Sequence, residues 1–189
     1  MKKLFLIIGA PGSGKTTDAE LIAQKNENVT HYSTGDMLRA EVASGSETGI
    51  ELDSYMSKGN IVPINIVIQT IVNAIKSAPS DVIIIDGYPR STEQMHALDE
   101  YLANEDSVTL SNVIEIEVSE ETARDRVLGR ARGADDNNEV FDNRMSVYME
   151  PLPYIHAFYG PKEMLHCISG EGTIEAIVDE LNQFIQSKI

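Results

Sequence analysis

Eight residues near the N-terminus have the types and spacing of a phosphate-binding loop. They read Gly9-Ala10-Pro11-Gly12-Ser13-Gly14-Lys15-Thr16 and fit the pattern G-x-x-x-x-G-K-[ST] at each fixed position. Glycines let backbone N–H groups point at a polyphosphate, and the helix start that follows adds unpaired donors and a favourable dipole. Lys15 would reach the β- and γ-phosphates, and the Thr16 hydroxyl would bind a magnesium ion. The pattern predicts a nucleoside triphosphate site, or descent from one.

A carboxylate could supply the second half of a magnesium site. Residues 81–86 form an apolar run that ends in Asp86, as expected of a buried parallel strand. Ligands bind at the carboxyl ends of such strands, where an acid can hold magnesium through water. The alternative is that Asp86 is a turn residue before Gly87.

Seven arginines stand out in an acidic chain. The 189 residues carry a net charge of −15, which argues against general binding to nucleic acid or to an anionic membrane. A phosphate site must still be locally positive, and arginine suits bidentate phosphate contacts. Four arginines fall between residues 124 and 132, so we interpret this clustering as part of a site.

The elements that must position these groups alternate between strand and helix. Strands are predicted at residues 4–8, 29–33, 81–86, 112–118 and 164–169. Helices are predicted after Lys15, after Ser119, and at residues 36–44, 47–58, 64–77, 92–103 and 173–187. A further long helix is predicted around Phe141, Met145 and Tyr148, and Pro151 and Pro153 should kink or end it. The inward face of the last helix is predicted to be Ile174, Ile177, Val178, Leu181 and Ile185. The fold class is therefore α/β: three αβα layers around a parallel sheet of about five strands, with a helical insertion.

Metal clusters and disulfides are not expected. The one cysteine, Cys167, reads as a buried strand residue, and a reducing cytoplasm is the expected compartment. His31, His96, His156 and His166 lack the spacing of metal ligands, so each reads as a surface or core residue. No apolar run approaches the length of a membrane span.

Several motifs, in this order, resemble those of adenylate kinases over essentially the whole chain. They are the phosphate loop, Ser33-Thr34-Gly35-Asp36-Met37-Leu38-Arg39, Asp86-Gly87-Tyr88-Pro89-Arg90 with Gln94, Asp125-Arg126-Val127-Leu128-Gly129-Arg130, Arg132 with Asp135-Asp136, and Arg144. The resemblance implies reversible, Mg²⁺-dependent phosphoryl transfer between ATP and AMP to give two ADP. It also implies a role in nucleotide biosynthesis and adenine nucleotide homeostasis, and a monomeric state.

The resemblance also implies where ATP binds. Its phosphates would contact Gly12, Ser13, Gly14, Lys15, Thr16, Thr17 and Arg130, and its adenine Arg126 and the backbone of Gly172. Magnesium would be held by Thr16 and, through water, by Asp86.

AMP would occupy the other half of the site. Its implied contacts are Thr34, Arg39, Asn60, Ile61, Val62, Gly87, Tyr88, Pro89, Arg90, Gln94, Arg132 and Arg144. The implied catalytic residues are Lys15, Arg90, Arg130, Arg132 and Arg144, with Arg124 left at the surface. No general base is needed, because the attacking phosphate oxygen of AMP is already charged.

Two covers are expected on a core formed by residues 1–32, 78–130 and 139–189. They are an AMP-side insertion at 33–77 and a lid at 131–138, which is shorter than in many bacterial relatives and has no zinc. Together they form one kinase domain over residues 1–189 and would exclude water from the reaction.

Three alternatives remain open from the sequence. The chain could phosphorylate UMP, CMP or GMP, against which only Thr34 and Gln94 argue. A switch GTPase would need Asn-Lys-x-Asp and Asp-x-x-Gly motifs, which we do not find. An inactive nucleotide-binding regulator would be expected to have lost Lys15, Asp86, Arg90 or Arg130, which are present.

Overall fold

A computed structural model describes residues 1–130, apart from the side chain of Arg130, and residues 137–189. Five parallel strands form one sheet, in the order β2-β3-β1-β4-β5. The strands are β1 (Lys2–Gly9), β2 (Val29–Ser33), β3 (Val82–Asp86), β4 (Val108–Glu117) and β5 (Leu165–Ser169). The predicted parallel five-stranded α/β fold is confirmed.

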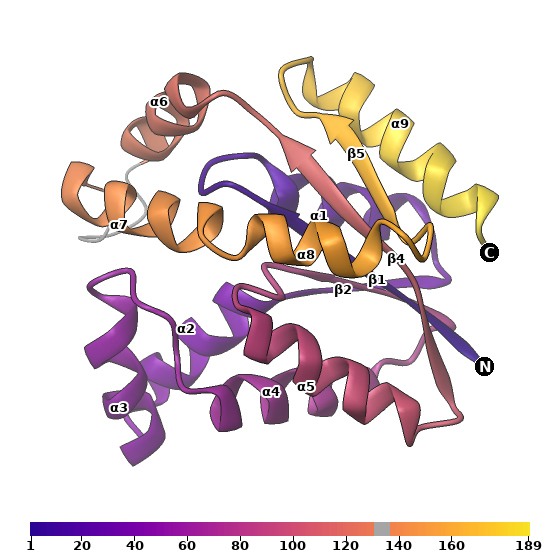
Figure 1. Ribbon diagram of the computed structural model, residues 1–189, viewed down its shortest axis with the longest axis horizontal. Helices are drawn as coiled ribbons and strands as arrows, with labels where there is room; N and C mark the ends of the chain where they lie inside the picture. The colour runs from indigo at the N-terminus through magenta and orange to yellow at the C-terminus, as the bar shows by residue number, and fades with distance from the viewer. Residues whose placement is uncertain (131–136) are drawn as a thin grey trace.

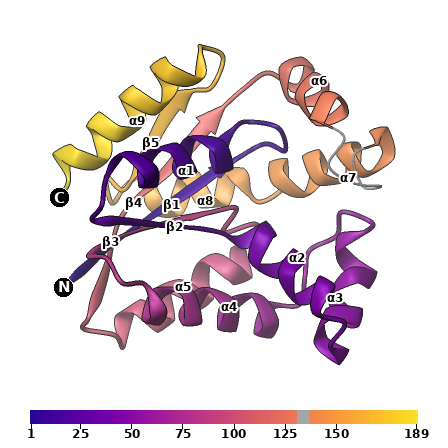
Figure 2. The same ribbon diagram turned by 180° about the vertical axis from the view of Figure 1, so that it is seen from behind.

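The described helices cover both faces of this sheet (Figure 1). Their bounds are α1 (Lys15–Lys25), α2 (Thr34–Ser44), α3 (Glu47–Met56), α4 (Ile64–Ser77), α5 (Thr92–Ala103), α6 (Glu120–Arg130), α7 (Asn138–Met149), α8 (Leu152–Tyr159) and α9 (Ile174–Ser187). Helices α1 and α9 pack on one face, while α4, α5 and α8 pack on the other, as the reverse view also shows (Figure 2). None of these helices combines the length and apolar character needed to cross a membrane.

Strand β1 shows why the sequence folds into three layers. Leu4, Leu6 and Ile8 belong to the core under α4, α5 and α8, while Phe5 and Ile7 belong to the core under α1 and α9. Side chains alternate between the faces of a strand, so a continuous apolar run suits a strand that is covered on both sides. The central position of β1 in the sheet follows from this.

The carboxyl ends of the strands place the predicted site at one edge of the sheet. Strand β1 lies between β3 and β4. After β1 the chain continues to β2 and β3 on one side of it, and after β3 it crosses to β4 on the other side, so the direction of the connections reverses here. Such a change of direction opens a crevice between the two loops, and ligands bind there in open α/β sheets. The phosphate loop after β1 and Asp86 at the end of β3 both border this crevice, since Ile7 is paired with Asp86.

Two burial predictions are wrong. Cys167 is in a strand, but its side chain is exposed, because β5 is an edge strand and this position lies on an open part of the surface. Ile174 is 55% exposed, whereas Ile177, Val178, Leu181 and Ile185 are buried as predicted. Ile174 is the first residue of α9, where the helix has not yet reached the sheet.

Candidate active site

One cavity joins the phosphate loop to the start of the insertion. Its lining includes Lys15 and Thr16 of the phosphate loop, Asp86 at the end of β3, and Thr34 and Gln94. Further predicted site residues in its wall are Arg39, Asn60, Ile61, Val62, Gly87, Pro89, Arg90 and Arg144. Thus one hollow collects two of the predicted phosphate contacts, Lys15 and Thr16, and most of the predicted contacts of the second nucleotide.

The phosphate loop has the backbone that anion binding requires. Gly12 and Gly14 have φ of +83° and +97°, values that side-chain-bearing residues rarely adopt. Helix α1 starts after Gly14 without a side-chain cap. The buried hydroxyl of Ser13 has no partner among the described residues. Backbone and hydroxyl donors at this helix start are therefore suited to phosphate oxygens.

The two predicted magnesium residues lie in direct contact. The Thr16 hydroxyl donates to Asp86 Oδ1 at 3.0 Å, and the Asp86 side chain is only 2% exposed. Magnesium prefers oxygen ligands from few protein groups, with water completing its shell. A hydroxyl and a carboxylate side by side in the cavity fit such an ion.

His31 is a site neighbour that sequence reasoning missed. Its Nε2 lies 2.7 Å from Asp86 Oδ2, and the Ser33 hydroxyl lies 3.5 Å from Asp86 Oδ1. Strand β2 runs beside β3 with Ser33 opposite Asp86, so His31 and Ser33 meet the same carboxylate. The only sequence signal was their spacing of two on a strand, which places both side chains on one face.

The second half of the cavity offers polar groups above an apolar wall. The Thr34 hydroxyl is buried without a partner among the described residues. Gln94, 3% exposed, accepts a hydrogen bond from the Arg90 N–H on its Oε1 at 2.7 Å, which orients its amide. Leu38 and Val67 contribute apolar surface to the same cavity. This combination suits a flat base with donors and acceptors on its edge.

Arg90 and Arg144 supply positive charge in the cavity wall. Arg90 Nε donates to the Gly87 carbonyl at 2.9 Å, which aims the guanidinium. Although the side chain is exposed to the cavity, desolvation by the surrounding protein and the like charges of Arg144 and Arg39 lower the pKa of Arg90, while Asp86 opposes them. Arginines held this close suggest a site built for an anion. Arg39 pairs with Asp36 at the cavity rim.

Several other predicted site residues do not line this cavity or are not described. Arg126 donates to the carbonyls of Gly170 at 3.0 Å and Ser13 at 3.4 Å, so it borders the phosphate loop outside the main cavity. Gly172 is exposed in the loop before α9, and Tyr88 is fully buried behind the cavity. The Arg130 side chain and Arg132 lie outside the described residues, as do residues 131–136 of the predicted lid. Arg124 is half-buried in ion pairs with Glu120 and Asp142 and takes no part in the cavity.

Asp18 is a buried acid one helical turn behind the phosphate loop. It is 2% exposed, and its Oδ2 has no partner among the described residues. Burial raises the pKa of Asp18 to about 6, although the charge of Arg126 lowers it. Its ionised form is therefore poorly stabilised in the folded chain.

Replacing Asp18 with asparagine should increase stability at neutral pH but not at acid pH. In the unfolded chain Asp18 ionises above pH ~4, whereas in the folded chain it ionises only near pH 6, so the wild type loses stability as pH rises between these values. The difference in unfolding free energy between Asp18→Asn and wild type should grow by about 1–3 kcal/mol from pH 4 to pH 7.5. Urea unfolding at both pH values measures it. The surface variant Asp179→Asn should show no such growth, and a pH-independent difference for Asp18→Asn would contradict the interpretation.

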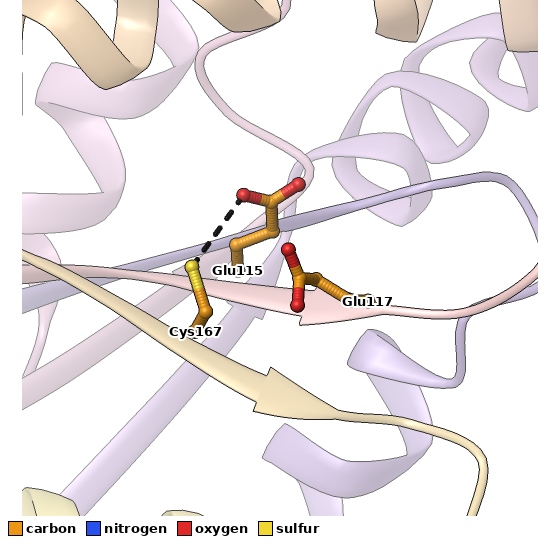
Figure 3. A group of neighbouring side chains, drawn as sticks. All are labelled: Glu115, Glu117 and Cys167. Carbon is orange, nitrogen blue, oxygen red and sulfur yellow. Dashed lines mark hydrogen bonds between the residues drawn. The ribbon is translucent and has the colours of Figure 1, made fainter.

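A second buried carboxylate, Glu115 on β4, ties the helices behind the site to the sheet. Its oxygens lie 2.5 Å from the Tyr148 hydroxyl and 2.5 Å from His156 Nε2, and the Cys167 thiol donates to it at 3.9 Å. Figure 3 shows Cys167 and Glu117 beside Glu115, three potential metal ligands. The donors around Glu115 already satisfy its oxygens, so we interpret the group as a structural network. Although Cys167 is exposed on one side, desolvation where its thiol meets Glu115, together with the negative charges of Glu115 and Glu117, raises the pKa of the thiol to about 11, which keeps it protonated and unreactive.

Comparisons with known proteins agree with this geometry. A family model described as adenylate kinase matches residues 7–164. Curated relatives named adenylate kinase include those of Wolinella succinogenes, 66% identical over 190 residues, and Helicobacter hepaticus, 65% identical over 190 residues, each with both chains fully covered. A third, from Campylobacter fetus subsp. fetus, is 62% identical over 189 residues, covering all of this chain and 99% of the relative. With its phosphate loop, parallel sheet and two-sided cavity, the chain belongs to the adenylate kinase family.

Proposed function

We propose that this chain catalyses ATP + AMP ⇌ 2 ADP, with the phosphate loop holding ATP and the half of the cavity that contains Thr34 and Gln94 holding AMP. The observation that carries the proposal is that one cavity is lined by Lys15 of the phosphate loop, by Gln94, and by Arg90 and Arg144. A site of this form brings two anionic nucleotides together in the line that phosphoryl transfer needs.

The chemical step needs positioning and charge, not a base. An oxygen of the AMP phosphate attacks the γ-phosphorus of ATP, the bond from that phosphorus to the β–γ bridging oxygen breaks, and ADP leaves with that oxygen. Lys15, Arg90 and Arg144 stabilise the charge of the transferred group, together with Arg130 and Arg132 as the resemblance implies. Thr16 and, through water, Asp86 would hold magnesium, which would supply charge neutralisation to the phosphates of ATP.

Water must be excluded during transfer, because it would otherwise accept the phosphoryl group. We assign this task to the insertion at 33–77 and the lid at 131–138, on the core formed by the remaining residues. We assign a monomer as the active form, as the resemblance to the family implies. We assign the protein to the cytoplasm, in line with a chain that has one free cysteine and no disulfide.

The choice of AMP rests on Thr34 and Gln94. The Gln94 amide is oriented by the Arg90 N–H, and its Oε1 keeps a second lone pair. A glutamine amide can pair with the donor and acceptor edge of adenine. The Thr34 hydroxyl, buried and without a partner in the described part of the chain, offers a further contact to the base.

A coupled assay for ADP, with Mg-ATP and each nucleoside monophosphate in turn, tests the proposal. AMP should be strongly preferred, and Gln94→Ala should raise KM for AMP about tenfold while KM for ATP changes less than twofold, because one or two hydrogen bonds are lost only on the AMP side. Equal effects on both KM values would refute the assignment of Gln94. A preference for UMP, CMP or GMP would overturn the base selectivity, and no transfer to any acceptor would favour an inactive regulator.

A further inference from the structure

The turn that follows α3 forms part of the AMP half of the cavity. Gly59, Asn60, Ile61 and Val62 all line the cavity. The turn is closed by N–H groups of Gly59 and Asn60, which donate to the carbonyls of Met56 at 3.0 Å and Tyr55 at 3.0 Å. These bonds fix the shape of the turn, but they connect it only to α3, which belongs to the same insertion. Its position relative to the core must come from other contacts.

Helix α7 provides such contacts through Asn143. The Asn143 Nδ2 donates to the Lys58 carbonyl at 2.6 Å and to Asn60 Oδ1 at 2.9 Å. An amide nitrogen has two hydrogens, so both are used by the turn. Two acceptors at this distance also require that the nitrogen, not the oxygen, of Asn143 faces them. Views from both sides show the chain after α3 reaching α7 (Figures 1 and 2).

Gly59 gives an independent sign that the turn is seated on α7. Its φ is +74°, and a Cβ at this position would lie 2.9 Å from Arg144 Cγ and 3.2 Å from both Val140 Cγ1 and the Val140 carbonyl. Val140, Asn143 and Arg144 are spaced three and four apart, so they share one face of α7. Backbone therefore meets helix directly, without room for a side chain.

The other end of α7 is anchored to the sheet. Tyr148, one turn beyond Arg144, lies with its hydroxyl 2.5 Å from the buried Glu115 of β4. Helix α7, which carries Arg144, is thus bonded to the sheet through Tyr148 in its last turn. Through Asn143 near its middle, it is bonded to the turn after α3. This arrangement makes α7 a rigid link between Arg144 and the AMP-side turn.

We propose that Asn143 is a positioning residue that holds the turn at residues 58–60 in the place where it can contact AMP. The inference rests on the proposed function, since it assumes that AMP occupies this half of the cavity. Asn143 itself does not line the cavity, so it acts through the turn. Its loss should weaken AMP binding and leave the phosphate loop and ATP binding intact.

The test compares Asn143→Ala, Asn143→Asp and the control Ser146→Ala, an exposed position on the same helix. Calorimetry with AMP gives Kd without turnover, steady-state assays give KM for ATP, and amide hydrogen exchange reports on residues 57–62. Asn143→Ala should raise Kd for AMP about 5- to 20-fold, because two hydrogen bonds of ordinary strength are lost. Asn143→Asp should raise it more, since its carboxylate would face two acceptor oxygens. KM for ATP should change less than twofold.

Faster exchange in residues 57–62 of both Asn143 variants, with Ser146→Ala unchanged, would support a role in holding the turn. Kd values for AMP within twofold of the control in both variants would overturn the inference. So would equal rises in Kd for AMP and KM for ATP, which indicate general damage to the fold. If the wild type bound no AMP at all, the proposed function would fail first; if the wild type binds AMP and the variants match it, only the role of Asn143 fails.

Discussion

Lys15→Ala is expected to lower kcat by at least ~10²-fold, because a fixed positive charge beside the transferred phosphoryl group is lost. Lys15 directly follows Gly14 at the end of the phosphate loop, whose glycines allow the backbone to surround a polyphosphate. Its Nζ lies 3.1 Å from the Ala10 carbonyl, and the side chain lines the cavity next to Thr16. The ammonium is therefore held within the loop, directed at the space that the terminal phosphates would fill.

The effect should fall on kcat more than on folding. Lys15 is only partly buried and lies in the first turn of α1, so its truncation leaves the core under α1 unchanged. Lys25→Ala is the matched control, since Lys25 ends the same helix and pairs with the exposed Asp179 at 3.3 Å. Single-turnover assays at saturating Mg-ATP and AMP measure the chemical step. A fall of less than tenfold in Lys15→Ala, or a similar fall in Lys25→Ala, would remove Lys15 from the proposed mechanism.

Local chemistry explains why the strands and most helices were predictable. The apolar runs that end at Asp86 and before Gly9 are typical of strands covered on both faces, and both are central in the sheet. A helix was expected after Ser119, and the Ser119 hydroxyl accepts a hydrogen bond from the Thr122 N–H at the start of α6. The Ser33 hydroxyl accepts one from the Asp36 N–H in the same way at the start of α2. Such features depend on residues near in sequence, so one sequence suffices to find them.

Features that depend on neighbours in space were less accessible. Strand β4 begins at Val108, earlier than predicted, because the mixed segment before Asn112 is paired with β1 across an irregularity in register. Cys167 looked like a core residue in its own strand, but the position of that strand at the sheet edge exposes it. No sequence spacing shows which strand borders which.

The same reason separates predicted from missed site residues. Thr16 and Asp86 could be paired from motif and strand-end rules, and their 3.0 Å contact agrees with that pairing. His31 and Asn143 act on the site through Asp86 and through the turn after α3, respectively. His31 lies on β2 and Asn143 on α7. Their proximity to the site can be recognised only once the order of the strands in the sheet and the packing of α7 are known.

Gly12→Ala is expected to lower kcat/KM for ATP about 10²-fold, through displacement of the phosphate loop. Gly12 has φ +83°, and an added Cβ would lie 2.4 Å from the Ala123 carbonyl and 3.0 Å from Val127 Cγ2 on α6. Both partners belong to a fixed helix, since Ala123 and Val127 are buried with Ala10 and Phe141 in one cluster. The methyl group must therefore push the loop away from α6, and the amides that would meet the phosphates move with it.

Gly45→Ala separates this clash from backbone strain. Gly45 has φ +70° at the end of α2, and an added Cβ would meet nothing within 4 Å. A left-handed conformation costs a side-chain-bearing residue about 1–2 kcal/mol, so Gly45→Ala should lose about this much unfolding free energy in urea and Gly12→Ala, which also has the clash, at least this much. Only Gly12→Ala should also lose activity with ATP, while Gly45→Ala keeps kcat/KM within twofold of wild type. Equal losses of activity in the two variants would show that backbone strain, not the contact of the loop with α6, causes the loss. We expect the variants to differ, because only the Cβ added at Gly12 would contact the Ala123 carbonyl.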